Sequence, residues 1–200
     1  MDFKNIAQLF EHTTTKNESK ELFFYKKNNS WIGLTGKDIR IAVEDISFGL
    51  RSLGIEEKSN IAILSNNSPR WAISDYGIIC SSMTTVTIYP TLIDNHVEFI
   101  LNDSKSQLIF VENQEQYLKI KRIYDSCYNL KFIVLMDDSC EDENDFLMNM
   151  SSLFDKGKKY SQSSNFNFNQ ITNISNPTSG PTTHLFTCTQ TLEAPTLPLP

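Results

Sequence analysis

Few side chains in this sequence have the spacing that metal binding or nucleophilic catalysis requires. The histidines lie far apart, without the HExxH or H-x-H spacing of metal sites: His12, His96 and His184. The cysteines form no C-x-x-C pair: Cys80, Cys127, Cys140 and Cys188. We therefore predict no catalytic and no metal-binding residue, and we expect free thiols in a reducing compartment. A Cys–His pair formed only by folding stays open.

An acidic run at residues 137–145 is the one segment that suggests calcium. Calcium loops of the EF-hand type need a glycine at the sixth position and a bidentate glutamate at the end. The run has neither feature in register, so we predict a solvated loop after a strand.

Phosphate binding has no recognisable motif either. Neither GxGxxG nor GxxxxGK[ST] occurs, and the nearest segment is TSGPTT at residues 178–183. Pro181 removes one backbone N–H donor there, and no lysine lies between residues 160 and 200. We therefore predict a plain loop and no cofactor-binding residue.

The composition is that of one globular domain with an acidic surface. The chain has 200 residues, of which 40% are hydrophobic and 21% charged, which is enough apolar material for a core. Its 18 basic and 24 acidic residues give a net charge of −6, which disfavours a nucleic-acid partner. No apolar run reaches the roughly 18–20 residues of a membrane span, and the first residues lack a signal-peptide pattern. We expect a cytoplasmic protein and leave peripheral membrane contact open.

The chain divides into three segments by composition. Residues 1–20 are expected to form an N-terminal helical segment, and residues 21–159 carry charges throughout. From residue 160 to residue 200 the only charged residue is Glu193, and five of the seven prolines fall in this stretch. We predict that residues 160–200 are a low-complexity, disordered tail.

Between these ends, short strands alternate with helices. Residues 21–26 and 30–35 predict a hairpin, and four apolar runs predict strands: 60–64, 84–89, 107–112 and 131–136. Apolar residues at helical spacing predict helices between them: 35–53, one opening at Ser68-Pro69, one opening at Asp94, and 114–125.

Capping residues mark where these helices begin and end. Thr35 and Asp38 form a capping-box pattern, and Gly54 stands where the first helix should stop. Ser68 is expected to cap the second helix with proline at its first position, and Asp94 to cap the third.

Strands of five or six apolar residues alternating with helices predict a doubly wound α/β fold with a mostly parallel sheet. Ligands of such folds bind outside the carboxyl ends of the strands. Here these ends are residues 65–67, 90–92 and 112–113, which carry small or polar side chains.

The middle of the chain resembles the AMP-forming acyl-CoA synthetases, and the long-chain fatty acid–CoA ligases most of all. The likeness extends from about residue 21 to about residue 159 and rests on an ordered set of segments: FGLRSLGI (48–55), NNSPRWAISD (66–75), TIYPTL (87–92), EFILNDS (98–104) and LIFVE (108–112).

The resemblance implies a two-step ligase that uses ATP, magnesium and coenzyme A. A fatty acid carboxylate attacks the α-phosphate of ATP and forms an acyl-adenylate with release of pyrophosphate. The thiol of coenzyme A then displaces AMP. The resemblance also implies the fold, since this region is the N-terminal subdomain of these enzymes.

The likeness stops after Pro177, before the ATP-binding loop and the catalytic lysine that such a ligase would need. Thr87 and residues 82–84 depart from the family in smaller ways that affect packing. We expect an N-terminal fragment whose reading frame or splicing changed near Pro177, inactive as a ligase by itself. The alternatives are a non-catalytic interaction module that self-associates through exposed apolar faces, and an unrelated flavodoxin-like binder of a small ligand.

Overall fold

The computed structural model describes residues 3–164 and 167–169. Predictions that fall on other residues lie outside this part of the chain, which applies to the loop at 178–183, to His184 and Cys188, and to most of the predicted tail. Within residues 3–164 and 167–169, no helix combines the length and the apolar character needed to cross a membrane.

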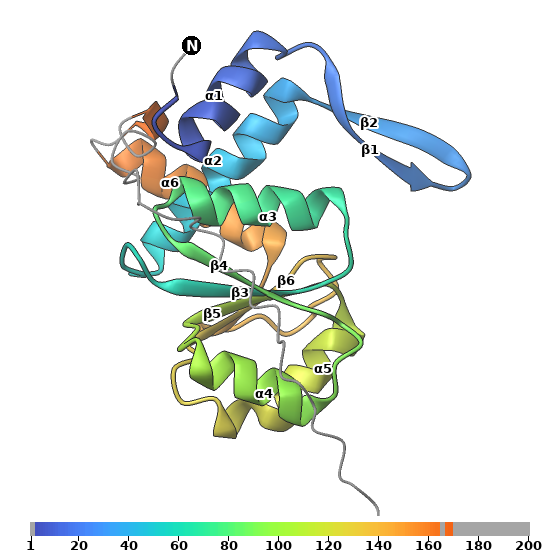
Figure 1. The fold of residues 1–200 in the computed structure, drawn as a ribbon, viewed down its shortest axis with the longest axis vertical. Helices are drawn as coiled ribbons and strands as arrows, with labels where there is room; N and C mark the ends of the chain where they lie inside the picture. The colour runs from blue at the N-terminus through green and yellow to red at the C-terminus, as the bar shows by residue number, and fades with distance from the viewer. Residues whose placement is uncertain (1–2, 165–166, 170–200) are drawn as a thin grey trace, which may run out of the picture.

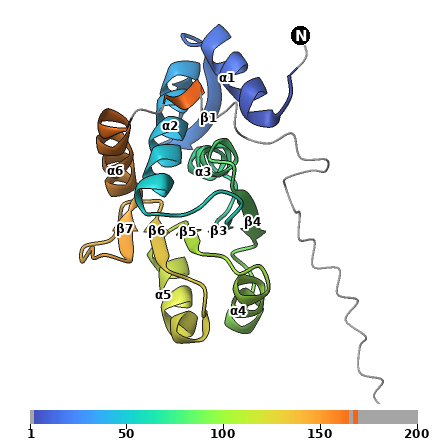
Figure 2. The same cartoon turned by 90° about the vertical axis from the view of Figure 1, so that its left-hand side faces the viewer.

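The core of the fold, drawn in Figure 1, is a five-stranded parallel sheet with the order β4-β3-β5-β6-β7, which is clearest in Figure 2. Its strands are short and mostly buried: β3 (Asn60–Leu64), β4 (Thr84–Ile88), β5 (Leu108–Val111), β6 (Phe132–Leu135) and β7 (Leu147–Asn149). The register places Ile61 beside Thr85 on one side and beside Leu108 on the other. Because both faces of a covered parallel sheet are buried, the strands are apolar runs, as the sequence predicted.

Helices cover both faces of the sheet, so the doubly wound α/β fold is confirmed (Figure 2). On one face lie α2 (Gly36–Ser52), α3 (Pro69–Cys80) and α6 (Met150–Ser163), with α1 (Ile6–Lys16) packed outside them against α2 and α3. On the other face lie α4 (Asp94–Asp103) and α5 (Gln114–Ile123). Each face has its own cluster of buried apolar side chains.

Local capping chemistry sets the ends of the first two long helices of this core. The Thr35 hydroxyl accepts the Asp38 N–H, and the Asp38 carboxylate accepts the Thr35 N–H, so the predicted capping box is present. The Ser68 side chain accepts the Trp71 N–H at the start of α3. Gly54 follows Leu53, the C-cap residue of α2, and has φ +72°, a conformation that favours glycine.

The predicted capping role of Asp94 is wrong. Ile93 occupies the N-cap position of α4 without a side-chain hydrogen bond, and Asp94 is the first helical residue. The Asp94 carboxylate instead accepts two hydrogen bonds from Arg122 of α5, at 2.6 and 3.0 Å. The Arg122 guanidinium of α5 therefore binds both carboxylate oxygens of Asp94, the atoms with which a capping aspartate would accept backbone N–H groups.

The predicted hairpin is a separate antiparallel sheet of β1 (Glu21–Lys27) and β2 (Ser30–Thr35), which projects from the body of the molecule (Figure 1). Asn28 and Asn29 connect the strands with φ of 49° and 61°. Two consecutive left-handed residues suit the tight turn of a hairpin, and asparagine tolerates that conformation better than most residues.

Two elements were not predicted from the sequence, β7 and α6. β7 has only three residues and follows the acidic run, so it gives almost no periodic signal. α6 does carry apolar residues at helical spacing, Met150, Leu153, Phe154 and Tyr160, and that signal was missed. α6 continues to Ser163, past the residue at which the composition changes. The predicted helix 114–125 ends earlier than expected, because α5 stops at Ile123 and a 3-10 turn, Tyr124–Ser126, follows.

Candidate functional site

The carboxyl edge of the parallel sheet is the place where this fold can form a ligand site. The chain leaves β3 toward α3 on one face and leaves β5 toward α5 on the opposite face. Since β3 and β5 are neighbours, their outgoing connections diverge and leave a crevice between them. This is the topological switch point at which doubly wound folds bind ligands.

The structure brings two of the three predicted strand ends into direct contact there. The Glu112 carboxylate accepts hydrogen bonds from the Asn66 N–H at 3.0 Å and from Asn66 Nδ2 at 2.8 Å. The Glu112 N–H in turn donates to the Leu64 carbonyl at 3.1 Å. Asn66 lines a pocket on one side of this bridge and Glu112 lines a pocket on the other. The Asn66–Glu112 pair is therefore a shared wall between two pockets.

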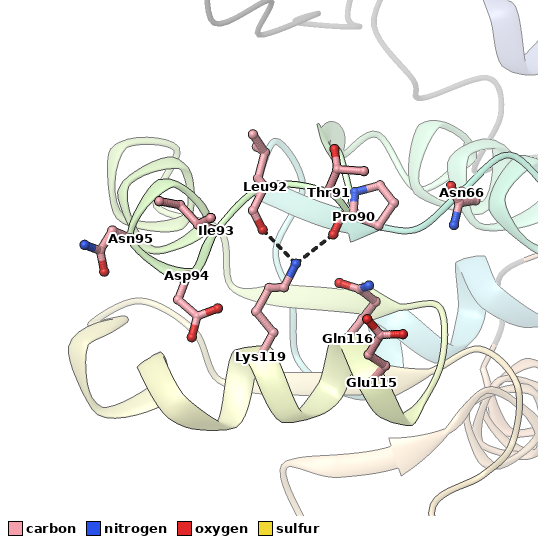
Figure 3. A pocket seen from close by; sticks show the side chains of 10 residues that line it. All are labelled: Asn66, Pro90, Thr91, Leu92, Ile93, Asp94, Asn95, Glu115, Gln116 and Lys119. Atoms are coloured by element: carbon pink, nitrogen blue, oxygen red, sulfur yellow. Dashed lines mark hydrogen bonds between the residues drawn. The ribbon is translucent and has the colours of Figure 1, made fainter.

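The first, which we name the loop-side pocket, lies between the β4–α4 connection and the first turns of α5 (Figure 3). Its volume is about 720 Å³. Its wall contains the third predicted strand end, residues 90–92, together with Lys119. The Lys119 ammonium donates to the carbonyl oxygens of Pro90 and Leu92, at 2.7 Å each (Figure 3). The three predicted strand ends thus gather around one edge of the sheet.

The side-chain carbonyl oxygen of Gln116 is a hydrogen-bond acceptor in the wall of the loop-side pocket that receives no hydrogen bond from the described residues. Its side chain is 6% exposed and lines the pocket. In the described part of the chain, its Oε1 atom accepts no hydrogen bond. An unsatisfied buried oxygen costs free energy, so a bound water or a ligand carrying an N–H or O–H group would be stabilised there.

The second, the hairpin-side pocket, has a volume of about 570 Å³ and lies between the hairpin, α2, α3 and α6. Its lining is apolar over much of its surface: Leu34, Ala42, Ile73, Met136, Met150 and Phe154. Charged side chains also line it: Lys27, Arg70, Glu112 and Asp137. An apolar pocket with a few charged groups suits an amphipathic small molecule.

Arg70 is held in place beside this pocket. Its guanidinium contacts the Asp138 carboxylate at 2.9 Å, and Asp138 also accepts the Ser151 N–H at 2.8 Å. Partial burial works to raise the pKa of Asp138, but the Ser151 hydrogen bond and Arg70 outweigh it and lower the pKa below its usual range. Asp138 therefore stays ionised and fixes one end of the acidic segment.

The acidic run is exposed over most of its length, as a solvated loop would be. Among residues 3–164 and 167–169, no group of three or more metal-ligating side chains lies close together. The His12 ring lies on α1, tilted by 47° to the Phe3 ring with 5.2 Å between their centroids.

The cysteines of the described segment are free thiols, with Cys80 and Cys127 buried. Burial raises the pKa of the Cys80 thiol far above its usual value and raises the pKa of Cys127 to about 11. Both thiols are therefore neutral near pH 7 and poor nucleophiles.

Lys119, Gln116 and Arg70 were not identified as site residues from the sequence. Residues 116 and 119 are three apart in a helix that the sequence did predict, so they share a face. That spacing was the available signal, but it does not say that the face lies under the β4–α4 connection. Only the packing of α5 against that connection shows it.

Comparison with known proteins links this architecture to one family. The profile of the family described as "AMP-binding enzyme" matches residues 10–178. Long-chain-fatty-acid–CoA ligase ACSBG2 of Xenopus laevis is 28% identical over 153 residues, which are 76% of this chain and 21% of that protein. Long-chain-fatty-acid–[acyl-carrier-protein] ligase AEE15 of Arabidopsis thaliana is 31% identical over 68% of this chain and 19% of its own length.

A solved structure agrees with this at the level of the fold. The long-chain-fatty-acid–CoA ligase FadD1 of Archaeoglobus fulgidus superposes with a TM-score of 0.65 at 16% identity, over 76% of this chain and 29% of that one. The chain spans about a fifth of the length of the curated relatives it matches.

Proposed function

The chain belongs to the AMP-binding enzyme family, and on that premise we propose that it supplies the amino-terminal α/β part of a long-chain fatty acid–CoA ligase. The single observation that carries the proposal is the family match over residues 10–178, which spans the whole parallel sheet and its helices. The names of the similar proteins support the fatty acid substrate class. The family match also removes the alternative of an unrelated flavodoxin-like binder.

The proposed reaction joins a fatty acid to coenzyme A at the expense of ATP. The carboxylate attacks the α-phosphate, which gives an acyl-adenylate and pyrophosphate, and the thiol then displaces AMP. Fatty acid, ATP and coenzyme A are the proposed ligands. We further propose a cytoplasmic location with peripheral membrane contact, for which free cysteines and the fatty acid substrate are the support.

We propose that the 200-residue chain by itself does not catalyse this reaction. Two points support this proposal. The chain spans only about a fifth of the length of its relatives, and its sequence is predicted to lack an ATP-binding loop and a catalytic lysine. We expect purified chain, incubated with ATP, Mg²⁺, coenzyme A and palmitate, to release no AMP above the enzyme-free background. Fatty acid–dependent AMP release, or tight Mg·ATP binding in calorimetry, would overturn this part of the proposal.

A segment replacement tests the ligase assignment itself. The corresponding segment of a full-length long-chain fatty acid–CoA ligase is replaced by residues 21–163 of this chain, and AMP release is measured with palmitate and with acetate. We expect soluble protein that prefers palmitate. The matched control is the same enzyme with the segment deleted. A chimera that folds and yet adenylates no fatty acid would contradict the assignment.

A second proposed role is an interaction module that associates with itself. The observation in its favour is the outward face of the hairpin, where Trp31 is 71% exposed and Phe24 is 54% exposed. The register places Phe24 opposite Gly33, so Trp31 is its diagonal neighbour on the same face. Paired exposed aromatic side chains on a projecting element are a common feature of contact surfaces.

A further inference from the structure

Two cations of α5 connect that helix to the segment between β4 and α4. Lys119 donates to the carbonyl oxygens of Pro90 and Leu92, and Arg122 donates twice to the Asp94 carboxylate. Residues 119 and 122 are three apart, so both side chains leave the same face of the helix. Together their four hydrogen bonds span the whole connection, from its second residue to the first residue of α4.

Few other contacts hold this connection in place, and the main one is the partly buried Leu92 side chain, which packs against the apolar cluster on the α4 and α5 face. Tyr89 is 72% exposed and Ile93 is 61% exposed, so the side chains at its two ends contribute little burial. Pro90 has no N–H to donate, and the Leu92 N–H makes a single turn hydrogen bond to the Tyr89 carbonyl at 3.1 Å. α4 itself begins without a side-chain cap. Apart from the packing of Leu92, the path of the main chain in the connection is therefore set by the cations beneath it.

The two cations do not contribute equally. The Arg122–Asp94 pair lies at the surface, where solvent screens ion pairs and their contribution is small. The hydrogen bonds of Lys119 are part-buried, and their acceptors are backbone oxygens. Charge-assisted hydrogen bonds are stronger than neutral ones, and these two fix the path of the main chain itself.

We propose that Lys119, assisted by Arg122, is a positioning residue that holds the β4–α4 connection as a fixed wall of the loop-side pocket. Without the ammonium, the Pro90 and Leu92 carbonyls lose their donor, and the connection is free to open away from α5. The pocket would then lose its shape although the sheet stays folded. This inference rests on the geometry of residues 89–94 and α5, and it holds whether or not the proposed ligase activity is correct.

Hydrogen–deuterium exchange of the full 200-residue chain tests the proposal. In Lys119→Met we expect the Leu92 amide, whose N–H donates to the Tyr89 carbonyl within the connection, to exchange about tenfold to a hundredfold faster, the range expected for losing a charge-assisted hydrogen bond. The amides of β3 and β5 should exchange at the wild-type rate. Lys119→Arg restores a cation with several donors and should return exchange to within about threefold of wild type. The matched control is Lys121→Met, since Lys121 is exposed on another face of α5.

Unchanged exchange in Lys119→Met would overturn the proposal. So would equal acceleration in the connection, β3 and β5, because Lys119 would then support the fold as a whole. Failure of Lys119→Arg to restore exchange would also count against it, since the role assigned is that of a cation.

A measurement on the unmutated chain keeps the proposal testable if Lys119→Met fails to fold. An acylating reagent at limiting dose is followed by mass spectrometry at each lysine. Because its ammonium is engaged and part-buried, Lys119 should react about tenfold more slowly than Lys121. Equal reactivity of the two lysines would overturn the proposal.

Discussion

Asp45 shows how a single buried charge weakens an interface that is otherwise closely packed. It lies on α2, is 8% exposed, and faces Lys158 of α6 at 3.8 Å. Burial raises the pKa of Asp45 to about 6, and Glu44 and Asp155 add to the increase, while Lys158 opposes it. The distance to Lys158 is too long for a strong ion pair, so desolvation outweighs the attraction.

We predict that this carboxyl group makes the protein less stable as pH rises. Its pKa is higher in the folded state than its usual value of 3.8, so the folded state binds more protons between about pH 4 and pH 6. The free energy of unfolding should therefore fall by about 1–2 kcal/mol from about pH 4.5 to about pH 7.5 through this group. Asp45→Asn should remove that component and be the more stable protein at the higher pH.

Urea unfolding of both proteins at the two pH values measures the difference. Glu141→Gln is the control, because Glu141 is an exposed carboxylate of the acidic loop. Parallel pH dependence of wild type and Asp45→Asn would show that Asp45 does not have the raised pKa.

At the scale of elements, the close approach of α2 and α6 depends on two glycines. A Cβ atom on Gly157 of α6 would overlap the backbone carbonyl of Asp45, and one on Gly49 of α2 would overlap Leu153. The two helices touch along their length, and this contact attaches the last described helix to the body. Glycine, which lowers helix propensity, is used here for close packing.

Gly157→Ala should therefore destabilise the chain by about 3 kcal/mol or more, because the methyl group meets backbone and cannot be accommodated by a side-chain rotation. Thermal or urea unfolding measures the loss. Lys156→Ala, one residue earlier on the exposed side of α6, should change stability by no more than about 0.5 kcal/mol. Equal effects of the two substitutions would show that α2 and α6 are not in close contact.

At the scale of the whole molecule, the hairpin is an element with little apolar support on its outward face. We predict concentration-dependent association of the chain at micromolar concentration, because shielding Trp31 and Phe24 from water is favourable. Sedimentation velocity should show an increasing sedimentation coefficient with concentration for wild type and a monomer for Trp31→Lys. Tyr128→Lys, which changes an aromatic residue that is 86% exposed outside the hairpin, is the matched control. A monomeric wild type would contradict the prediction.

Much of the architecture was readable from local signals. The capping box at Thr35, the Ser68-Pro69 start and the asparagine turn all depend on residues within four positions of one another, so the sequence shows them directly. The apolar runs likewise indicated buried parallel strands. Asp94 was misjudged for the opposite reason, because its partner Arg122 is 28 residues away.

The sequence by itself determined the alternation of strands and helices, the polar residues at the strand ends, and the family likeness. The tertiary structure alone decided the strand order, the Asn66–Glu112 bridge and the position of Lys119 beneath the β4–α4 connection. The physical reason is the separation along the sequence between the residues that interact. Periodicity and capping report interactions within one or two turns of chain, whereas these contacts join segments 27 to 46 residues apart that meet only when the sheet assembles.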